Sequence, residues 1–461
     1  MYKQNNLSQG NVVKQLIFFA LPFVISNLLQ TLYSVIDMII VGQFNGTVSM
    51  SGVNIGSQLT MLMMNVAVGL SAGATVLIAQ SVGAKKTKQL QKIIGTLLTS
   101  LIILSVIMTV LMLTFHNELL RLIRTPEESF LEASHFLIVT SLGILFIFGY
   151  NALSAVMRGM GDSKSPLYFI AISCFVNVLL DMVFVGSFHW GATGAGIATV
   201  ISQGISMILC IIYLVRRKFV FDFRIRSFGI DKKQLKAILK LGIPISVQNM
   251  IGNLSFLFIT ALVNSIGVTA SAAVGAVGKY NGFAILPAIA MNAAISTMCA
   301  QNLGAGREDR ALKTWKTGLV ISYSISILIF IFTRMFPELI LGMYGHDPEM
   351  IRLGVIYLSA FSIDYLTVPM HFSMNGLFIG AGHTTYSLFT NIIAGLVVRI
   401  PMAYILCNVA HLGLFGVGLA VPLATFSSIL CNFVFYFSGR WRKKTIKFQE
   451  QDNNEKVCLE E

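Results

Sequence analysis

Residues 21–42 read LPFVISNLLQTLYSVIDMIIVG. They form one apolar run that is long enough to cross about 30 Å of hydrocarbon as a helix, and this run contains the carboxylate of Asp37. A second apolar run, VNVLLDMVFVG (176–186), carries Asp181 in the same way. Ionisable groups inside membrane spans are costly and rare, so they are candidate functional residues. A carboxylate there can be neutralised by a proton or by a cation, which predicts a membrane protein that handles cations.

The composition of the whole chain indicates a helical membrane protein. Of its 461 residues, 55% are hydrophobic and 11% are charged, whereas about a quarter of the residues in a soluble domain are charged. The apolar segments predict an all-α polytopic fold with twelve transmembrane helices. We expect these helices at residues 14–38, 52–80, 91–114, 133–157, 165–187, 192–215, 237–264, 271–300, 312–333, 350–377, 384–407 and 414–438.

The loop charges predict the orientation of these helices. When loops are assigned alternately to the two sides, 27 of the 33 Lys and Arg residues fall on one side and 4 on the other, while Lys279 and Arg399 fall within spans. Such a bias marks the cytoplasmic side, so both termini are expected in the cytoplasm. The net charge of +13 is thus explained by topology and by contact with the lipid bilayer, and no nucleic-acid partner is expected.

The two halves of the chain repeat one another. LPFVISNLLQ (21–30) resembles IPISVQNMIG (243–252), AQSVGAKKTKQL (79–90) resembles AQNLGAGREDRAL (300–312), RGMGD (158–162) recurs as IGAGH (379–383), and GATGAGIA (191–198) recurs as GLFGVGLA (413–420). The constant offset of 221 or 222 residues indicates a duplicated six-helix unit. We therefore expect an N-terminal bundle (1–215), a basic cytoplasmic linker (216–236), a C-terminal bundle (237–440) and a polar cytoplasmic tail (441–461), with a cleft between the bundles.

The first half carries a group of oxygen-bearing side chains at similar expected depths. Carboxylate, amide and hydroxyl oxygens can hold a small cation or store a proton, although they could equally form a polar network that only pins the helices. The expected cation-coupling residues are Asp37, Asp181, Asn177, Asn151 and Thr199, and Na⁺ would be held by Asp37, Asn177, Asp181 and Thr199. At the repeat offset of 222 residues, Asp37 corresponds to Ile259 and Asp181 to Ala403, so the second half lacks both carboxylates.

Several other residues are candidates for contact with a transported molecule. Soft methionines together with polar and aromatic side chains suit a surface that binds varied apolar compounds. The expected cleft residues are Gln30, Tyr33, Met61, Met64, Gln248, Asn249, Tyr280 and Asp364. Asp364, Lys279 and Arg399 are the charges expected within the second bundle, where they either pair with one another or contact an ion or substrate.

The sequence carries no pattern typical of an enzyme. It contains no HExxH, GxSxG, GxxxxGK[ST] or paired CxxC motif, and its seven histidines show no ligand spacing. We therefore expect no catalytic residue and no cofactor. A membrane-embedded enzyme is a weaker alternative, because it would need a nucleophile–base pair or a metal cluster.

Taken together, these motifs resemble the multidrug and toxic compound extrusion (MATE) family, and in particular its DinF-like prokaryotic branch. The resemblance covers nearly the whole chain and rests on LPFVISNLLQTLYSVIDMIIVG, AVMRGMGDSKSP, NVLLD and AQSVGA/AQNLGA. It implies a secondary antiporter of a prokaryotic inner membrane that exports organic, often cationic, drugs by alternating access in exchange for H⁺ or Na⁺.

The resemblance also implies roles for individual residues. Asp37 and Asp181, with Asn151, Asn177 and Thr199, match the coupling site of the DinF-like branch, and Pro22 matches a proline at which the first helix bends. The acidic residue that other branches carry in the seventh helix is Gly252 here, which favours coupling in the first bundle. We expect a monomer that handles small organic molecules. A lipid-linked oligosaccharide flippase of related architecture is the main alternative, and it would need several cationic groups in the cleft.

Overall fold

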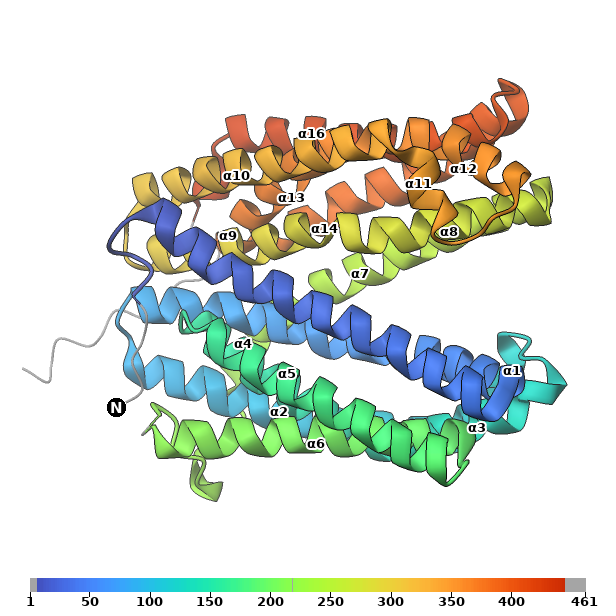
Figure 1. Ribbon diagram of the computed structural model, residues 1–461. Coiled ribbons are helices and arrows are strands. Elements are labelled where there is room, and N and C mark those ends of the chain that lie inside the picture. Colours follow the sequence, from blue (N-terminus) through green and yellow to red (C-terminus); the bar gives the residue numbers. More distant parts are fainter. Residues whose placement is uncertain (1–5, 218, 444–461) are drawn as a thin grey trace, which may run out of the picture.

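Helices make up almost all of the chain in the computed structural model, which describes residues 6–217 and 219–443. The helices of the first half are α1 (Val12–Gly83), α2 (Thr87–Leu122), α3 (Glu127–Leu142), α4 (Ile144–Gly159), α5 (Lys164–Asp181) and α6 (Gly191–Arg216). Those of the second half are α7 (Lys232–Ile266), α8 (Val268–Ala284), α9 (Leu286–Gly304), α10 (Glu308–Met335), α11 (Pro337–Gly342), α12 (Pro348–Phe361), α13 (Asp364–Gly380), α14 (Thr384–Ile392), α15 (Ile400–Tyr404) and α16 (Gly413–Phe437). The two halves form two bundles that lie side by side (Figure 1).

The number of membrane spans in the structure agrees with the number predicted from the sequence. In the described residues, nine helices are long and apolar enough to cross a membrane, and two bent helix pairs raise the number to eleven. The 72-residue helix α1 would measure roughly 108 Å if straight, far more than one span needs. It folds back at Gly46, where φ is 79° and ψ is −176°, and so supplies two spans. The predicted fold of twelve transmembrane helices in two bundles of six is confirmed.

The connection between the first two spans differs from the sequence prediction. We expected a loop between residues 38 and 52, but both helices continue up to Gly46. A single residue with positive φ is enough to reverse the chain, and glycine adopts that conformation at little cost. The residues on either side therefore keep their helical hydrogen bonds.

The duplication extends to the irregularities of the helices. The reversal at Gly46 recurs at Gly267, which has φ of 150° and separates α7 from α8. The bend of 52° between α3 and α4 recurs as a bend of 44° between α12 and α13. The π-helical turn at Met182–Ser187 recurs at Ile405–Val409. The repeat offset thus describes a structural duplication as well as a sequence duplication.

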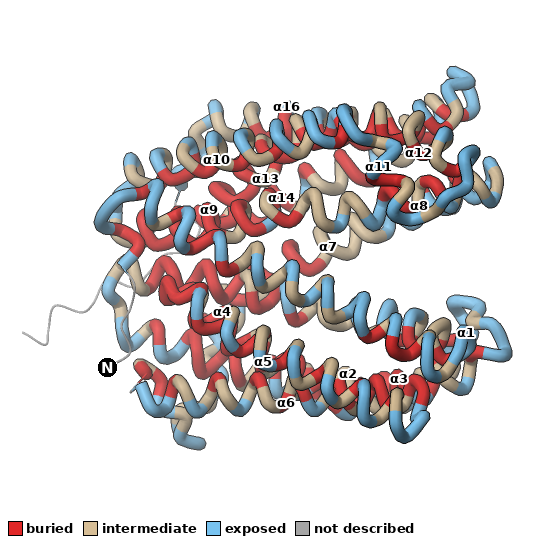
Figure 2. The backbone as a smooth tube through the Cα atoms, viewed as in Figure 1, coloured by how far each residue is buried: buried red, intermediate tan, exposed pale blue. Residues whose placement is uncertain are grey.

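The two bundles meet at the end of the molecule that carries the short connections 84–86, 160–163, 305–307 and 381–383. The Lys- and Arg-containing linker between α6 and α7, described at residues 217 and 219–231, lies at the same end, which we call the basic end. Here the apolar core of the first bundle continues into Leu241, Ile245 and Ala300 of the second. Close backbone packing joins α1 to α7, because a side chain on Gly73 would overlap the backbone of Gly242. Buried segments are accordingly concentrated where the bundles touch (Figure 2).

Two symmetry-related glutamines close the basic end, and we call this arrangement the glutamine latch. The side-chain Nε2 of Gln80 in the first bundle donates to the carbonyl of Gly380 in the second, at 2.9 Å. Its repeat counterpart Gln301 donates to the carbonyl of Gly159 in the first bundle, at 3.0 Å. Both glutamines are buried. The repeated AQ and glycine motifs of the sequence therefore meet across the interface between the bundles.

The start of α7 explains why the linker is shorter than predicted. We expected the second bundle to begin at residue 237, but α7 begins at Lys232. The carboxylate of Asp231 caps the helix by accepting from the backbone N–H groups of Lys233 at 3.0 Å and Gln234 at 3.1 Å. The hydrogen bond from Gln234 is the main reason that the pKa of Asp231 lies below its usual value. Most of the predicted polar tail, residues 444–461, lies outside the described residues.

Candidate functional site

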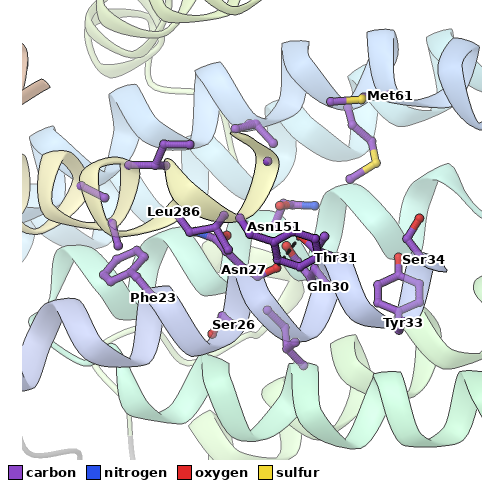
Figure 3. Close-up of a pocket in the computed structure, with 18 of the residues that line it drawn as sticks. Phe23, Ser26, Asn27, Gln30, Thr31, Tyr33, Ser34, Met61, Asn151 and Leu286 are labelled. Carbon is purple, nitrogen blue, oxygen red and sulfur yellow. Dashed lines mark hydrogen bonds between the residues drawn. The ribbon is translucent and has the colours of Figure 1, made fainter. Parts of the chain in front are cut away.

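A cavity of about 1380 Å³ lies between the bundles. Its lining extends from Gly42 and Thr47, beside the reversal at Gly46, to Arg158 and Ser163 near the basic end. The first bundle contributes side chains from α1, α4, α5 and α6, and the second contributes mainly α8 and α9. Figure 3 shows the row that α1 presents to this space, from Phe23 to Ser34. The glutamine latch lies at the basic end, where the bundles are in contact.

Most of the residues that line the cavity are either apolar or polar without a charge. Four methionines contribute flexible surface, namely Met38, Met50, Met61 and Met64. The amides and hydroxyls include Asn27, Gln30, Thr31, Asn151, Gln203, Asn292 and Thr297. A cavity with a large apolar area and a few convergent polar groups is typical of a small-molecule binding site.

Half of the residues expected in the cleft line this cavity. Gln30, Tyr33, Met61 and Met64 are part of its wall. The other four, Gln248, Asn249, Tyr280 and Asp364, are not among the lining residues.

Three of these four side chains have partners within the second bundle. Gln248 accepts a hydrogen bond from Ser387 Oγ at 2.9 Å. The hydroxyl of Tyr280 lies 2.7 Å from that of Thr333, and Asp364 accepts from Thr367 at 2.7 Å.

The two aspartates that decided the sequence interpretation lie together inside the first bundle. Asp37 on α1 and Asp181 at the end of α5 are 9% and 0% exposed, and the two carboxyl groups are close enough for their charges to interact. Within the described residues, Asp37 Oδ1 and both carboxyl oxygens of Asp181 are buried without a hydrogen-bond partner. Asn177, one turn before Asp181, is 1% exposed, and neither its amide nitrogen nor its amide oxygen has a hydrogen-bond partner in residues 6–217 and 219–443. These unpaired groups form what we call the acidic site.

Such a group of unsatisfied buried atoms is costly unless something neutralises it. A proton shared between the carboxyl groups or a small cation held by their oxygens would do so, and the amide oxygen of Asn177 is a further hard ligand. The π-helical turn Met182–Ser187 follows Asp181 directly, and such turns often occur at functional sites. The described residues contain no group of three or more His, Cys, Asp and Glu side chains that could hold a metal ion.

The side-chain atoms of the other two predicted coupling residues are not among the unpaired buried atoms of the described residues. Asn151 lines the cavity and donates to the carbonyl of Ile147 at 2.8 Å. Thr199 is half-buried on α6, and its carbonyl accepts from Ser202 Oγ at 2.9 Å. The structure therefore brings Asp37, Asp181 and Asn177 together and places Asn151 on the cavity side.

The equivalent position in the second bundle has the opposite charge. Ile259 and Ala403, which replace the two aspartates, are buried. At the same offset of 222 residues, Asn177 is replaced by Arg399. Its guanidinium lies 4.6 Å from the ring centroid of Phe256. An arginine at this position disfavours a second cation there.

Pro22 is buried within α1, and the helix continues through it. A proline in this position removes one helical hydrogen bond and crowds the preceding turn. The helix α1 is therefore easier to bend at Pro22 than elsewhere, although it is unbroken there, and this position lies fifteen residues before Asp37.

Comparison with known proteins agrees with this architecture. Residues 22–183 and 244–405 each match the MatE family profile. The probable multidrug resistance protein YpnP of Bacillus subtilis (strain 168) is 30% identical over 95% of this chain and 98% of its own length.

Solved structures show the same fold. A MOP superfamily transporter from Pyrococcus furiosus superposes with a TM-score of 0.90 at 22% identity, covering 96% of this chain and 99% of its own. An outward-facing multidrug resistance MATE family transporter also gives a TM-score of 0.90, at 23% identity, covering 96% of this chain and 100% of its own.

Proposed function

Because this chain belongs to the MatE family of membrane transporters, we propose that it exports amphipathic organic compounds in exchange for H⁺ or Na⁺. The observation that carries the proposal is the acidic site next to a large cavity between two bundles: three of the four carboxyl oxygens of Asp37 and Asp181 are buried without a hydrogen-bond donor in the described part of the chain. The multidrug names of the similar proteins support an organic cargo. The protein is a transporter and not an enzyme.

The acidic site is proposed to bind the coupling ion. Asp37 and Asp181 would take up the proton or Na⁺, and Asn177 would supply a neutral oxygen to the same ion. Neighbours of Asp37 on α1, such as Ser34 and Met38, line the cavity, so repacking of α1 around a newly loaded carboxyl would change the binding surface. An ion that loads Asp37 can thus weaken cargo binding without touching the cargo.

The glutamine latch holds the two bundles together at the basic end, so the cavity opens toward the other end of the molecule. This arrangement supports transport by alternating access. If the basic end is cytoplasmic, as the loop charges predict, the structure corresponds to an outward-open state in a prokaryotic inner membrane. The latch must then open for the cavity to face the cytoplasm. Ion binding can drive this step only if the ion binds one state more tightly than the other, because equal affinity shifts no population.

Purified protein in lipid vesicles tests the coupling directly. Vesicles are loaded with a fluorescent organic probe, and a pH gradient or a Na⁺ gradient is imposed separately. We expect one of the two gradients to drive probe movement against its own concentration gradient, because the bound ion and the probe favour opposite states. Probe movement that is the same with and without either gradient would contradict ion coupling. Protein-free vesicles serve as the control.

A second expected result concerns Pro22. Pro22→Ala restores the missing hydrogen bond and stiffens α1, so transport should slow severalfold while ion binding at Asp37 stays near normal. Initial transport rates and ion binding are compared at matched protein levels, with Pro422→Ala in α16 as a control at another intrahelical proline. Equal rates for Pro22→Ala and the unaltered protein would exclude a hinge at this position.

A further inference from the structure

The charged side chains that line the cavity all have the same sign in the described part of the chain. Arg158 lies at the end of α4, near the basic end, and Lys279 lies on α8 of the other bundle. No Asp or Glu is found among the described lining residues, since Asp37 and Asp181 are buried inside the first bundle. The cavity therefore presents a positive surface to its contents.

Neither of these cations has an acidic partner among the described residues. The Arg158 guanidinium lies 5.5 Å from the ring centroid of Phe23, which also lines the cavity. Lys279 is exposed, and none of the described salt bridges or hydrogen bonds includes its ammonium group. It lies eleven residues into α8 from Val268, so about 17 Å along the helix. An unpaired ammonium this far inside a membrane span is rare and suggests a ligand contact.

The helix around Lys279 leaves room for a ligand. Gly275, Gly278 and Gly282 share one face of α8, and a Cβ atom added to any of them would meet nothing within 4 Å. Gly278 and Gly282 also line the cavity. The apolar body of a ligand can lie against this bare stretch of backbone while a charged group reaches Lys279. Flexible Met61 and Met64 on the α1 side of the cavity can adapt to its shape.

We propose that the cargo of this transporter is an amphipathic organic acid whose carboxylate, sulfonate or phosphate group is held by Lys279 and attracted toward the basic end by Arg158. The proposal rests on the proposed export function and reverses the cationic cargo that the family resemblance implied. Its physical reason is that an anion satisfies two cations that have no acidic partner in the described part of the chain, whereas an organic cation is repelled by both.

Two fluorescent probes with the same ring system but opposite charge test this inference: pyrenesulfonate and pyrenylmethyl-trimethylammonium. Their binding is measured on full-length protein in uncharged nanodiscs without any gradient, so the result is independent of ion coupling. The variants are Lys279→Gln, Lys279→Glu and Arg158→Gln. Lys316→Gln is the matched control, because Lys316 is exposed on α10 and does not line the cavity.

We expect the unaltered protein to bind the sulfonate about tenfold more tightly than the ammonium probe, with the preference falling as salt is added. Lys279→Gln should remove most of this preference, Lys279→Glu should reverse it, and Lys316→Gln should leave it unchanged. No sulfonate binding, a preference for the ammonium probe, or a preference unaltered by Lys279→Glu would overturn the inference. Gradient-driven movement of the ammonium probe alone would refute the acidic cargo while leaving the exporter proposal intact.

The acidic group could belong to a soluble compound or to a lipid headgroup, and a second measurement distinguishes these sources. Vesicles containing fluorescent phosphatidylglycerol or fluorescent phosphatidylcholine are assayed for transfer between leaflets. Lys279-dependent transfer of the anionic lipid alone identifies a lipid acid and would favour the flippase alternative. Lys279-dependent movement of the pyrenesulfonate without lipid transfer identifies a soluble acid. Equal transfer of both lipids, together with equal binding of both probes, contradicts charge selection.

Discussion

Asp37→Asn is expected to abolish ion-driven export while the protein still folds and inserts into the membrane. Asparagine has nearly the same size as aspartate, but it neither titrates nor lends a negative charge to a cation. Asp37 Oδ1 has no hydrogen-bond partner among the described residues, so the substitution breaks no hydrogen bond of that atom. The loss should therefore appear in coupling and not in stability. Gradient-driven transport should fall to the level of protein-free vesicles, and thermal unfolding should change little.

Asp364→Asn is the matched control for this result. Asp364 is also a buried carboxylate in a membrane helix, but it accepts a hydrogen bond from Thr367 and belongs to the second bundle. We expect its replacement to reduce transport less than Asp37→Asn does. Full gradient-dependent export by Asp37→Asn would exclude the acidic site as the coupling site, and the opposite ranking of the two variants would move coupling to the second bundle.

Gly83→Ala is expected to have the second largest effect, because it prevents the basic end from closing. A Cβ at this position would overlap the backbone carbonyl oxygen of Gln301, and the symmetry-related Gly304 stands in the same relation to Gln80. Backbone atoms inside a packed interface cannot move aside as a flexible side chain can, so overpacking should cost about 1–3 kcal/mol. Since 1.4 kcal/mol is a factor of ten in an equilibrium constant, the ratio of closed to open basic ends should fall by about one to two orders of magnitude.

Distances between spin labels measure this shift. Labels at Thr87 and Lys313, both exposed near the basic ends of α2 and α10, report the separation of the two bundles. We expect a longer distance and weaker export in Gly83→Ala. Gly252→Ala is the control, because a Cβ added to this helical glycine meets nothing within 4 Å. An unchanged distance together with normal export would mean that the tight contact at Gly83 does not hold the basic end closed.

The glutamine latch and the acidic site relate to the sequence duplication in different ways. The latch uses both copies of the repeat equally, as expected for a contact between two related bundles. The acidic site uses one copy only, because Ile259, Ala403 and Arg399 stand where Asp37, Asp181 and Asn177 stand in the first bundle. A symmetric scaffold can thus rock about its interface while a single bundle responds to the ion.

Local properties of the sequence determined the fold class, the twelve spans, the duplication and the location of Asp37 and Asp181 in the first bundle. Hydropathy, repeat register and an ionisable group in an apolar run can each be recognised without knowing the neighbours in space. The sequence also contained the AQ motifs at Gln80 and Gln301, but their partners lie about 300 and 142 residues away along the chain.

Only the tertiary structure decided which side of each helix faces the cavity. Helices that are apolar around most of their circumference do not reveal their rotation, because lipid, core and cavity accept the same residues. For this reason Gln248 and Tyr280 point to partners inside their bundle, although their sequence suggested a cleft position. For the same reason Arg158, which the loop charges assigned to the cytoplasmic surface, shares a cavity with Lys279. The sign of the charge that meets the cargo depends on the packing of two bundles and not on any one segment.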